Sequence, residues 1–167
     1  RSVEGSLARL KREPIDLLYC HRPDPDVPLE ETLAVLGDLR RQGKIRCWGV
    51  SRWSADLIER AAALAPQFGL PSPSATQEPW NRLLDAPARR LATDLRASGI
   101  PVIAYSVMAR GVLAGKHLYE TAAPVDPAWP DDRAPWQTDA KTRSRIRQLI
   151  DLAAETGATT TSLLIAD

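Results

Sequence analysis

Four side chains able to do chemistry stand at the ends of four short apolar runs in this sequence. They are His21, Ser51, Gln77 and Tyr105, and they are separated by 30, 26 and 28 residues. A neutral imidazole can donate a hydrogen bond to a carbonyl oxygen, and a hydroxyl and a carboxamide can together bind a planar amide. An aromatic ring can stack on a flat ligand. These residue types can therefore donate, accept and stack, which makes the four positions candidates for a functional site.

Each of the four residues also has a purely structural interpretation. A single histidine at a strand end is often only hydrogen-bonded into the fold, and Ser51 and Gln77 could simply cap their strands. Tyr105 could be a core residue. Spacing alone leaves these alternatives open. The predicted strands and helices around the four residues help to decide between a functional and a structural role.

The apolar runs predict strands, and helical patterns fill the gaps between them. The run at 15–20 is almost continuously apolar, which is typical of a strand buried on both faces of a parallel sheet. The expected strands cover 15–20, 44–51, a weaker run at 74–77, and 100–106. A (β/α)8 barrel of roughly 250 residues has about 30 per unit and gathers its chemistry at the carboxyl ends of the strands. Since the repeat here has that length, we expect the four side chains along one rim.

Capping residues mark the expected helices. Pro28 suits the start of a helix, Gly43 suits the position after its end, and Ser54 can cap the next one. The expected helices cover 2–12, Pro28 to Gly43, Ser54 to Leu64 and 140–156, and a further helix starts at 159. One more helix contains Leu91 and Leu95 and ends at Gly99. Right-handed crossovers would make the alternating strands parallel. Four strands cannot close a barrel, so the chain is either an open sheet or half of something larger.

Composition excludes several classes of function. The chain has 167 residues, 44% of them hydrophobic and 26% charged, which is ordinary for a globular domain. A net charge of +1 gives no reason to expect nucleic acid or an acidic membrane as a partner. No apolar run approaches the roughly 20 residues that span a bilayer. The chain has no signal-peptide pattern and begins with Arg1, so we expect it to be trimmed, processed or partial.

The cysteines indicate a reducing compartment. Because strand side chains alternate, Cys20 and Cys47 are expected on opposite faces of the sheet, which disfavours a disulfide. Two reduced structural cysteines suit the cytoplasm. No Cys-x-x-Cys, His-Glu-x-x-His, Walker or G-x-G-x-x-G pattern occurs, so we expect neither a metal site nor a Rossmann fold.

Three motifs carry a resemblance to a known family. They are His21–Pro25 with Leu29–Thr32, then Gly49–Ser54, then Tyr105–Ser106 through Gly111 to Gly115–Lys116. In this order and spacing the chain resembles the aldo-keto reductase family, and is most similar to the branch with the potassium-channel beta subunits and their bacterial oxidoreductase relatives. The resemblance implies a partial (β/α)8 TIM barrel of class α/β, roughly strands four to seven with their helices. Residues 1–167 would form one partial domain without the first strands and the last one, and 117–139 would be a long loop and candidate lid.

The resemblance also implies roles for single residues. His21 would be catalytic and would orient the substrate carbonyl, whereas the family's Tyr, Asp and Lys would come from the part that precedes this chain. The channel-subunit branch tends to carry Asn where this chain has His21, which favours reductase chemistry over a sensing role. Ser51 and Gln77 would hold the carboxamide of a nicotinamide, and Tyr105 would lie against its ring. Arg52 would also bind the cofactor, and its alternative role is that of a surface cation.

A cofactor pyrophosphate would lie in the loop after Tyr105. The resemblance assigns Ser106, Met108, Arg110 and Lys116 to this cofactor-binding segment, although Val107 and Met108 replace the Pro-Leu of common relatives. It implies NADP(H), and the residues leave NAD(H) open.

The implied function is an NAD(P)H-dependent oxidoreductase that reduces aldehydes or ketones to alcohols, with a small carbonyl compound as substrate. The alternative is a non-catalytic, cofactor-binding regulatory or interaction module, or a fragment that needs a partner to complete the barrel. That partner would be another copy in a homo-oligomer or a second chain. Because three of the four expected catalytic positions are absent, we expect no turnover from residues 1–167 alone.

Overall fold

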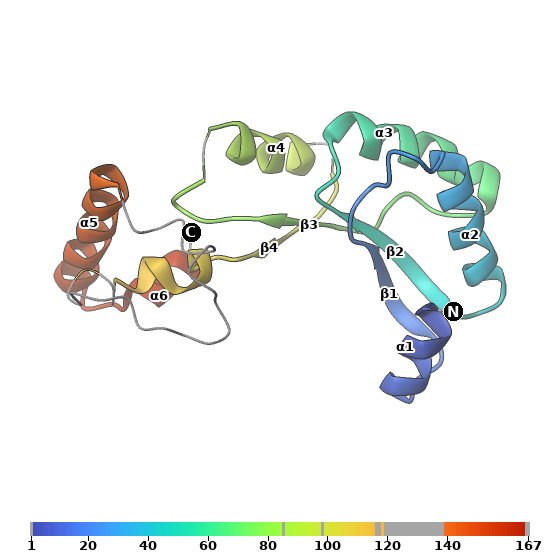
Figure 1. The fold of residues 1–167 in the computed structure, drawn as a ribbon, viewed down its shortest axis with the longest axis horizontal. Helices are drawn as coiled ribbons and strands as arrows, with labels where there is room; N and C mark the ends of the chain where they lie inside the picture. The colour runs from blue at the N-terminus through green and yellow to red at the C-terminus, as the bar shows by residue number, and fades with distance from the viewer. Residues whose placement is uncertain (1, 85, 98, 116–117, 119–138, 166–167) are drawn as a thin grey trace. The chain divides into compact units, whose positions relative to one another are not determined.

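The structure of the protein is a computed structural model of residues 1–167 (Figure 1). It describes every residue except 1, 85, 98, 116–117, 119–138 and 166–167. The described chain divides into two compact units. Unit 1 comprises residues 1–78 and 86–105, and unit 2 comprises residues 79–85 and 106–167.

Unit 1 contains a four-stranded sheet in the order β1-β2-β3-β4. The strands are β1 (Ile15–Cys20), β2 (Ile45–Ser51), β3 (Thr76–Pro79) and β4 (Val102–Tyr105). β1 pairs with β2 and β2 with β3, both in parallel, so consecutive strands are neighbours as in a barrel wall. The helices between them are α1 (Ser2–Leu10), α2 (Leu29–Arg41), α3 (Ala55–Leu64), the 3-10 helix η1 (Ala65–Phe68) and α4 (Ala86–Ala97).

The predicted boundaries hold at most helix ends and shift at some strands. Pro28 is the N-cap of α2, Gly43 has a φ of 70°, and Ser54 Oγ accepts a hydrogen bond of 3.3 Å from Leu57 N–H. The weak strand predicted at 74–77 begins instead at Thr76 and runs to Pro79. Its start is delayed because Pro71 and Pro73 precede it, although Ser74 N–H already donates to Trp48 O at 2.8 Å. Strand β4 is likewise shorter than the predicted 100–106.

The core of unit 1 lies between one face of the sheet and its helices, and α2 and α3 lie on one side of β1 and β2 in Figure 1. Trp48 and Val50 are fully buried on this face, and Leu33 of α2 and Ile58 of α3 are fully buried against it. Gly37 allows η1 to approach α2, because a Cβ there would lie 2.3 Å from the main-chain oxygen of Phe68.

The cysteines lie as the alternation predicts. Cys20 is opposite Val50 and packs against the core, whereas Cys47 is opposite Leu17 and therefore faces the other side of the sheet. Both are free thiols, and burial raises the pKa of the Cys20 thiol.

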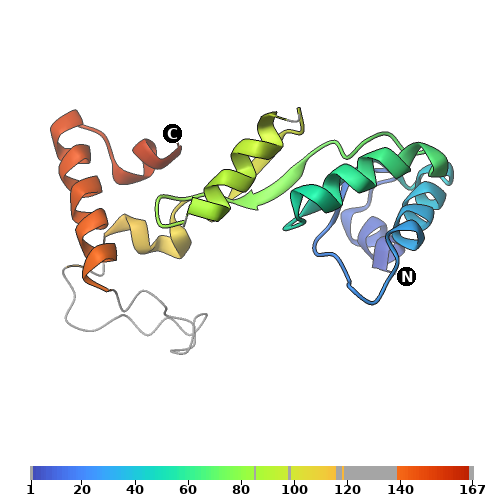
Figure 2. The same ribbon diagram turned by 90° about the horizontal axis from the view of Figure 1, so that it is seen from above.

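Unit 2 has a small core of its own, formed where the 3-10 helix η2 (Ala109–Ala114), α5 (Ala140–Thr156) and α6 (Thr160–Ile165) meet. These elements are the yellow and red segments of Figures 1 and 2. The limits predicted for α5 are confirmed, with Asp139 Oδ1 accepting from Thr142 N–H at 2.7 Å and Gly157 in the left-handed region. Most of the predicted loop at 117–139 lies outside the described residues.

Candidate functional site

Ser51, the last residue of β2, meets Gln77 of the adjacent parallel strand β3. They are partners in the register of β2 and β3, and Ser51 Oγ donates a hydrogen bond of 2.8 Å to the main-chain oxygen of Gln77. Because that bond uses the only hydroxyl proton of Ser51, its oxygen can act toward a ligand only as an acceptor. The amide nitrogen of a planar carboxamide is a donor that matches it.

His21 and Tyr105 also lie at strand ends. His21 follows Cys20, whose partner is Val50, so the register of β1 and β2 puts His21 at the level of Ser51. The residue is exposed, as a group that meets a ligand must be. Tyr105 is the last residue of β4 and is half-buried. Ser51 and Tyr105 thus end their strands and His21 directly follows one, as predicted, whereas Gln77 lies within β3, which continues to Pro79.

Arg52 lies in a backbone conformation that was not predicted. Its φ is 60°, in the left-handed region that costs free energy for a residue with a Cβ. Its N–H donates to Glu78 Oε1 at 2.9 Å, and Thr76 Oγ1 donates to the same oxygen at 2.7 Å. Glu78 is only 3% exposed. The sequence analysis did not identify this carboxylate as a candidate. The only indication in the sequence is that strand alternation puts Glu78 on the face opposite Gln77.

Tyr19 is a second residue that sequence reasoning missed. It is opposite Gly49 in the register, and a Cβ at residue 49 would lie 2.9 Å from Tyr19 Cε1 and 2.6 Å from the main-chain oxygen of Ala75. Gly49 precedes Ser51 by two residues, so the Tyr19 ring lies on the Ser51 face of the sheet. Its hydroxyl is buried without a partner among the described residues, and burial raises the pKa of the phenol. A buried unpaired donor is unusual in a folded protein.

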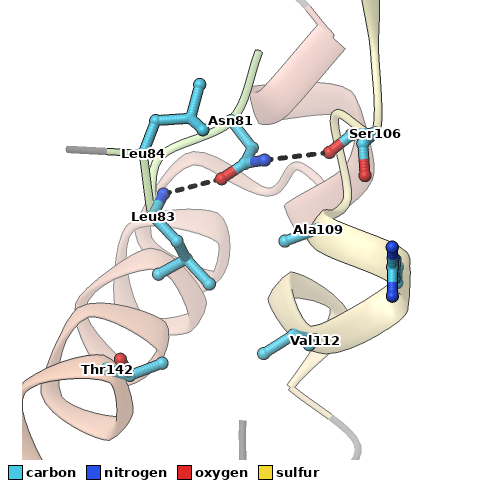
Figure 3. Close-up of a pocket in the computed structure, with 8 residues that line it drawn as sticks. Asn81, Leu83, Leu84, Ser106, Ala109, Val112 and Thr142 are labelled. Carbon is cyan, nitrogen blue, oxygen red and sulfur yellow. Dashed lines mark hydrogen bonds between the residues drawn. The ribbon is translucent and has the colours of Figure 1, made fainter. Parts of the chain in front are cut away.

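Unit 2 contains a cavity of about 410 Å³ beside the loop that follows Tyr105 (Figure 3). Its walls are Asn81, Leu83, Leu84, Ser106, Ala109, Arg110, Val112 and Thr142. Asn81 Nδ2 donates to the main-chain oxygen of Ser106 at 3.1 Å, and Asn81 Oδ1 accepts from Leu83 N–H at 2.9 Å. Figure 3 shows the Asn81 side chain between the two segments that it joins. Asn81 was also missed, since nothing local relates residue 81 to residue 106.

The loop at this cavity has an unusual concentration of left-handed residues. The φ angles of Ser106, Ala109 and Arg110 are 59°, 46° and 58°, and that of Gly111 is 90°. Two main-chain N–H groups of this turn are used within it: Ala109 N–H donates to Ser106 O at 2.8 Å, and Gly111 N–H donates to Met108 O at 2.9 Å. Ser106 and Arg110, both predicted as pyrophosphate-binding residues, line the cavity.

Met108, which was also assigned to this loop, is not among the described residues that line the cavity. Met108 instead packs against the hydrophobic core of unit 2. Lys116 lies outside the described residues.

Metal-binding clusters and membrane-spanning helices are both absent from the described part of the chain. It contains no group of three His, Cys, Asp or Glu side chains able to hold a metal ion. No helix within the same residues is long and apolar enough to cross a membrane.

Comparison with known proteins shows the family and the fold of this chain. The model of the aldo/keto reductase family matches residues 1–166. A putative voltage-gated potassium channel subunit beta from Schizosaccharomyces pombe is 32% identical over 171 residues, which cover 98% of this chain and 49% of that protein. The structure of a glycerol dehydrogenase from Gluconobacter oxydans superimposes with a TM-score of 0.80 at 28% identity, and again covers 98% of this chain and 49% of the other.

The chain therefore spans about half the length of the proteins that it matches. Its parallel sheet and helices form part of a (β/α)8 barrel, as the sequence predicts. The matched residues, the fold and the order of the strand-end motifs lead to one conclusion: the chain belongs to the aldo/keto reductase family.

Proposed function

We propose that the full-length protein containing this chain is an NAD(P)H-dependent oxidoreductase that reduces aldehydes or ketones to alcohols. Membership of the aldo/keto reductase family and the likeness to a glycerol dehydrogenase support the reaction class. The observation that carries the proposal is the bond between Ser51 and Gln77, with His21 at the same level of the neighbouring strand.

The strand-end residues of unit 1 fit a nicotinamide carboxamide. Ser51 Oγ is a fixed acceptor for its amide nitrogen, and the Gln77 side chain offers a donor and an acceptor. Tyr105 would contribute an aromatic contact, worth roughly 0.5–1.5 kcal/mol beyond buried area. When bound, a reduced nicotinamide supplies the hydride.

Within unit 2, we assign the Ser106–Gly111 turn to phosphate binding. The Arg110 guanidinium suits an anion, and Asn81 keeps Ser106 in place. Lys116 and Met108 keep the cofactor-binding roles implied by the family resemblance. We propose NADP(H) as the cofactor, with NAD(H) as the alternative.

The role of His21 in the reaction is to hold the carbonyl oxygen of the substrate. A neutral imidazole has one N–H donor, which stabilises the negative charge that develops on that oxygen. The proton donor and its supporting groups would lie in the half of the barrel that this chain lacks. We therefore propose that residues 1–167 alone have no turnover and that activity requires the complete barrel.

A regulatory role is the second candidate. The 32% identity to a putative potassium channel subunit beta favours this role. In it, the protein would bind a nicotinamide cofactor and act on a partner chain. We expect a cytoplasmic location in either case, because both cysteines are free.

Two assays on the full-length protein separate these functions. Quenching of tryptophan fluorescence on titration with NADPH, and in parallel with NADH, measures cofactor binding. Oxidation of the bound cofactor on addition of small aldehydes measures turnover. Binding with turnover supports the reductase, binding without turnover for any carbonyl substrate supports the regulatory module, and the absence of binding contradicts both.

A further inference from the structure

Glu78 is a buried carboxylate with no role in the proposed reaction. It is 3% exposed, and its Oε1 atom accepts hydrogen bonds from Thr76 Oγ1 at 2.7 Å and from Arg52 N–H at 2.9 Å. Among the described residues, no basic side chain forms an ion pair with it. Removing a carboxylate from water costs free energy that these two bonds must offset, so an apolar residue would suit this side of the strand better on packing grounds.

Two hydrogen bonds of opposite direction connect β2 and β3 near Glu78. The side chain of Ser51 reaches across to the main chain of Gln77, and the side chain of Glu78 reaches back to the main chain of Arg52. Each bond therefore joins the end of β2 to the end of β3, from opposite faces of the sheet.

The bond to Arg52 also explains how a residue with a Cβ keeps a φ of 60°. Left-handed conformations of such residues persist when the surrounding structure holds them. Without the Glu78 acceptor, the Arg52 N–H would lose its bond and the turn would be free to relax toward a more common conformation. Ser51 directly precedes Arg52 in this turn. Its hydroxyl oxygen must stay in place to accept a hydrogen bond from a carboxamide.

We propose that Glu78 is the positioning residue for the nicotinamide end of the site: it holds the Ser51–Arg52 turn in its left-handed form, and so fixes the Ser51 acceptor beside Gln77. This inference rests on the proposed cofactor-binding function. Glu78 itself touches neither cofactor nor substrate, because it lies on the other face of the sheet.

The test compares Glu78→Ala with Glu78→Gln in the full-length protein. The readouts are the Kd for NADPH and the Kd for adenosine 2′,5′-bisphosphate, which lacks the nicotinamide. We expect Glu78→Ala to raise the Kd for NADPH about tenfold, the size of a lost hydrogen bond to a charged group, and to leave that for the adenosine ligand unchanged. Glu78→Gln keeps an acceptor oxygen at the same place and should stay within about threefold of the wild type.

Two further variants control for stability. Ile45→Ala removes a side chain that is 2% exposed at the far end of β2, so it should destabilise the sheet without a selective loss of NADPH affinity. If Glu78→Ala does not fold, Thr76→Val removes the hydroxyl that orients the carboxylate and keeps the shape of the residue. It should raise the Kd for NADPH about threefold and leave the Kd for the adenosine ligand unaltered.

The outcomes are distinguishable. Unchanged NADPH affinity in Glu78→Ala, or an equal loss for both ligands, overturns the positioning role while the proposed function stands. A wild-type protein that does not bind NADPH or NADH overturns the proposed function, and this inference with it. Selective loss in Glu78→Ala with rescue in Glu78→Gln is the result that supports it.

Discussion

The hydroxyl of Ser51 donates to the main-chain oxygen of Gln77 at 2.8 Å and so links the last residue of β2 to β3. The bond settles which way the hydroxyl proton points, and it thereby leaves Ser51 as a preorganised acceptor. Preorganisation of this kind reduces the free energy that a ligand must spend on ordering its site.

Replacing Ser51 by Ala should weaken NADPH binding about fivefold, equivalent to a hydrogen bond of roughly 1 kcal/mol. Ser54→Ala is the matched control, because Ser54 caps α3 three residues further along the chain and its loss should cost roughly 0.5–2 kcal/mol of stability. Isothermal titration calorimetry on both full-length variants, with thermal unfolding alongside, checks the prediction. Equal cofactor affinities in the two variants would contradict the role of Ser51.

Replacing His21 by Ala should lower turnover at least about a hundredfold, because the imidazole stabilises charge on the substrate oxygen. Cofactor affinity should stay within about twofold of the wild type, since we assign His21 to the substrate. Steady-state kinetics with a small aldehyde measures the first effect and fluorescence titration the second. Arg22→Ala, at the exposed neighbouring residue, is the control and should leave both unchanged. Wild-type turnover in His21→Ala would remove the residue from the reaction.

Replacing Gly49 by Ala should destabilise the protein by roughly 1–3 kcal/mol, as expected for overpacking. The added Cβ would lie 2.6 Å from the main-chain oxygen of Ala75, which cannot move without displacing the chain that leads into β3. Gly5→Ala offers the opposite case, because its nearest neighbour is the flexible Arg9 side chain and alanine favours a helix by roughly 0.5–1 kcal/mol. Urea denaturation of both variants should move the midpoints in opposite directions. A Gly49→Ala variant as stable as the wild type would refute the close approach.

Acidification should remove one specific contribution to stability. The hydrogen bond from Lys44 Nζ, at 2.7 Å, is the main cause that lowers the pKa of Glu4 from 4.5 to about 2. A carboxyl whose pKa is lower in the folded state stabilises the fold above its unfolded pKa, and the effect is lost as the pH falls toward the folded pKa. The difference in urea midpoint between wild type and Glu4→Gln should therefore be largest above pH 4.5 and vanish near pH 2. A difference that does not depend on pH over this range would show that the ion pair contributes nothing.

Local patterns were sufficient to predict much of this fold. Each strand shows as an apolar run that ends in a polar or aromatic residue, so the positions of Ser51 and Tyr105 at strand ends followed from the sequence. Capping at Ser54 and the end of α5 before Gly157 were predicted for the same reason, since helix termini are marked by residues nearby in sequence. Parallel pairing then brought Gln77 beside Ser51.

The features that were missed depend on contacts between distant residues. Glu78 bonds to a turn 26 residues earlier in the chain, and Asn81 bonds to Ser106 25 residues later. Neither bond leaves a trace in the local pattern of hydrophobic and polar residues. The left-handed conformations of Arg52 and Ala109 were missed because no glycine marks those positions.

The most direct test of the central claim is a crystal structure of the full-length protein with NADP⁺ bound. We predict that the nicotinamide carboxamide contacts Ser51 and Gln77 at the ends of β2 and β3, with its nitrogen donating to Ser51 Oγ. A nicotinamide bound elsewhere, away from the strand ends that carry His21, Ser51 and Gln77, would contradict it.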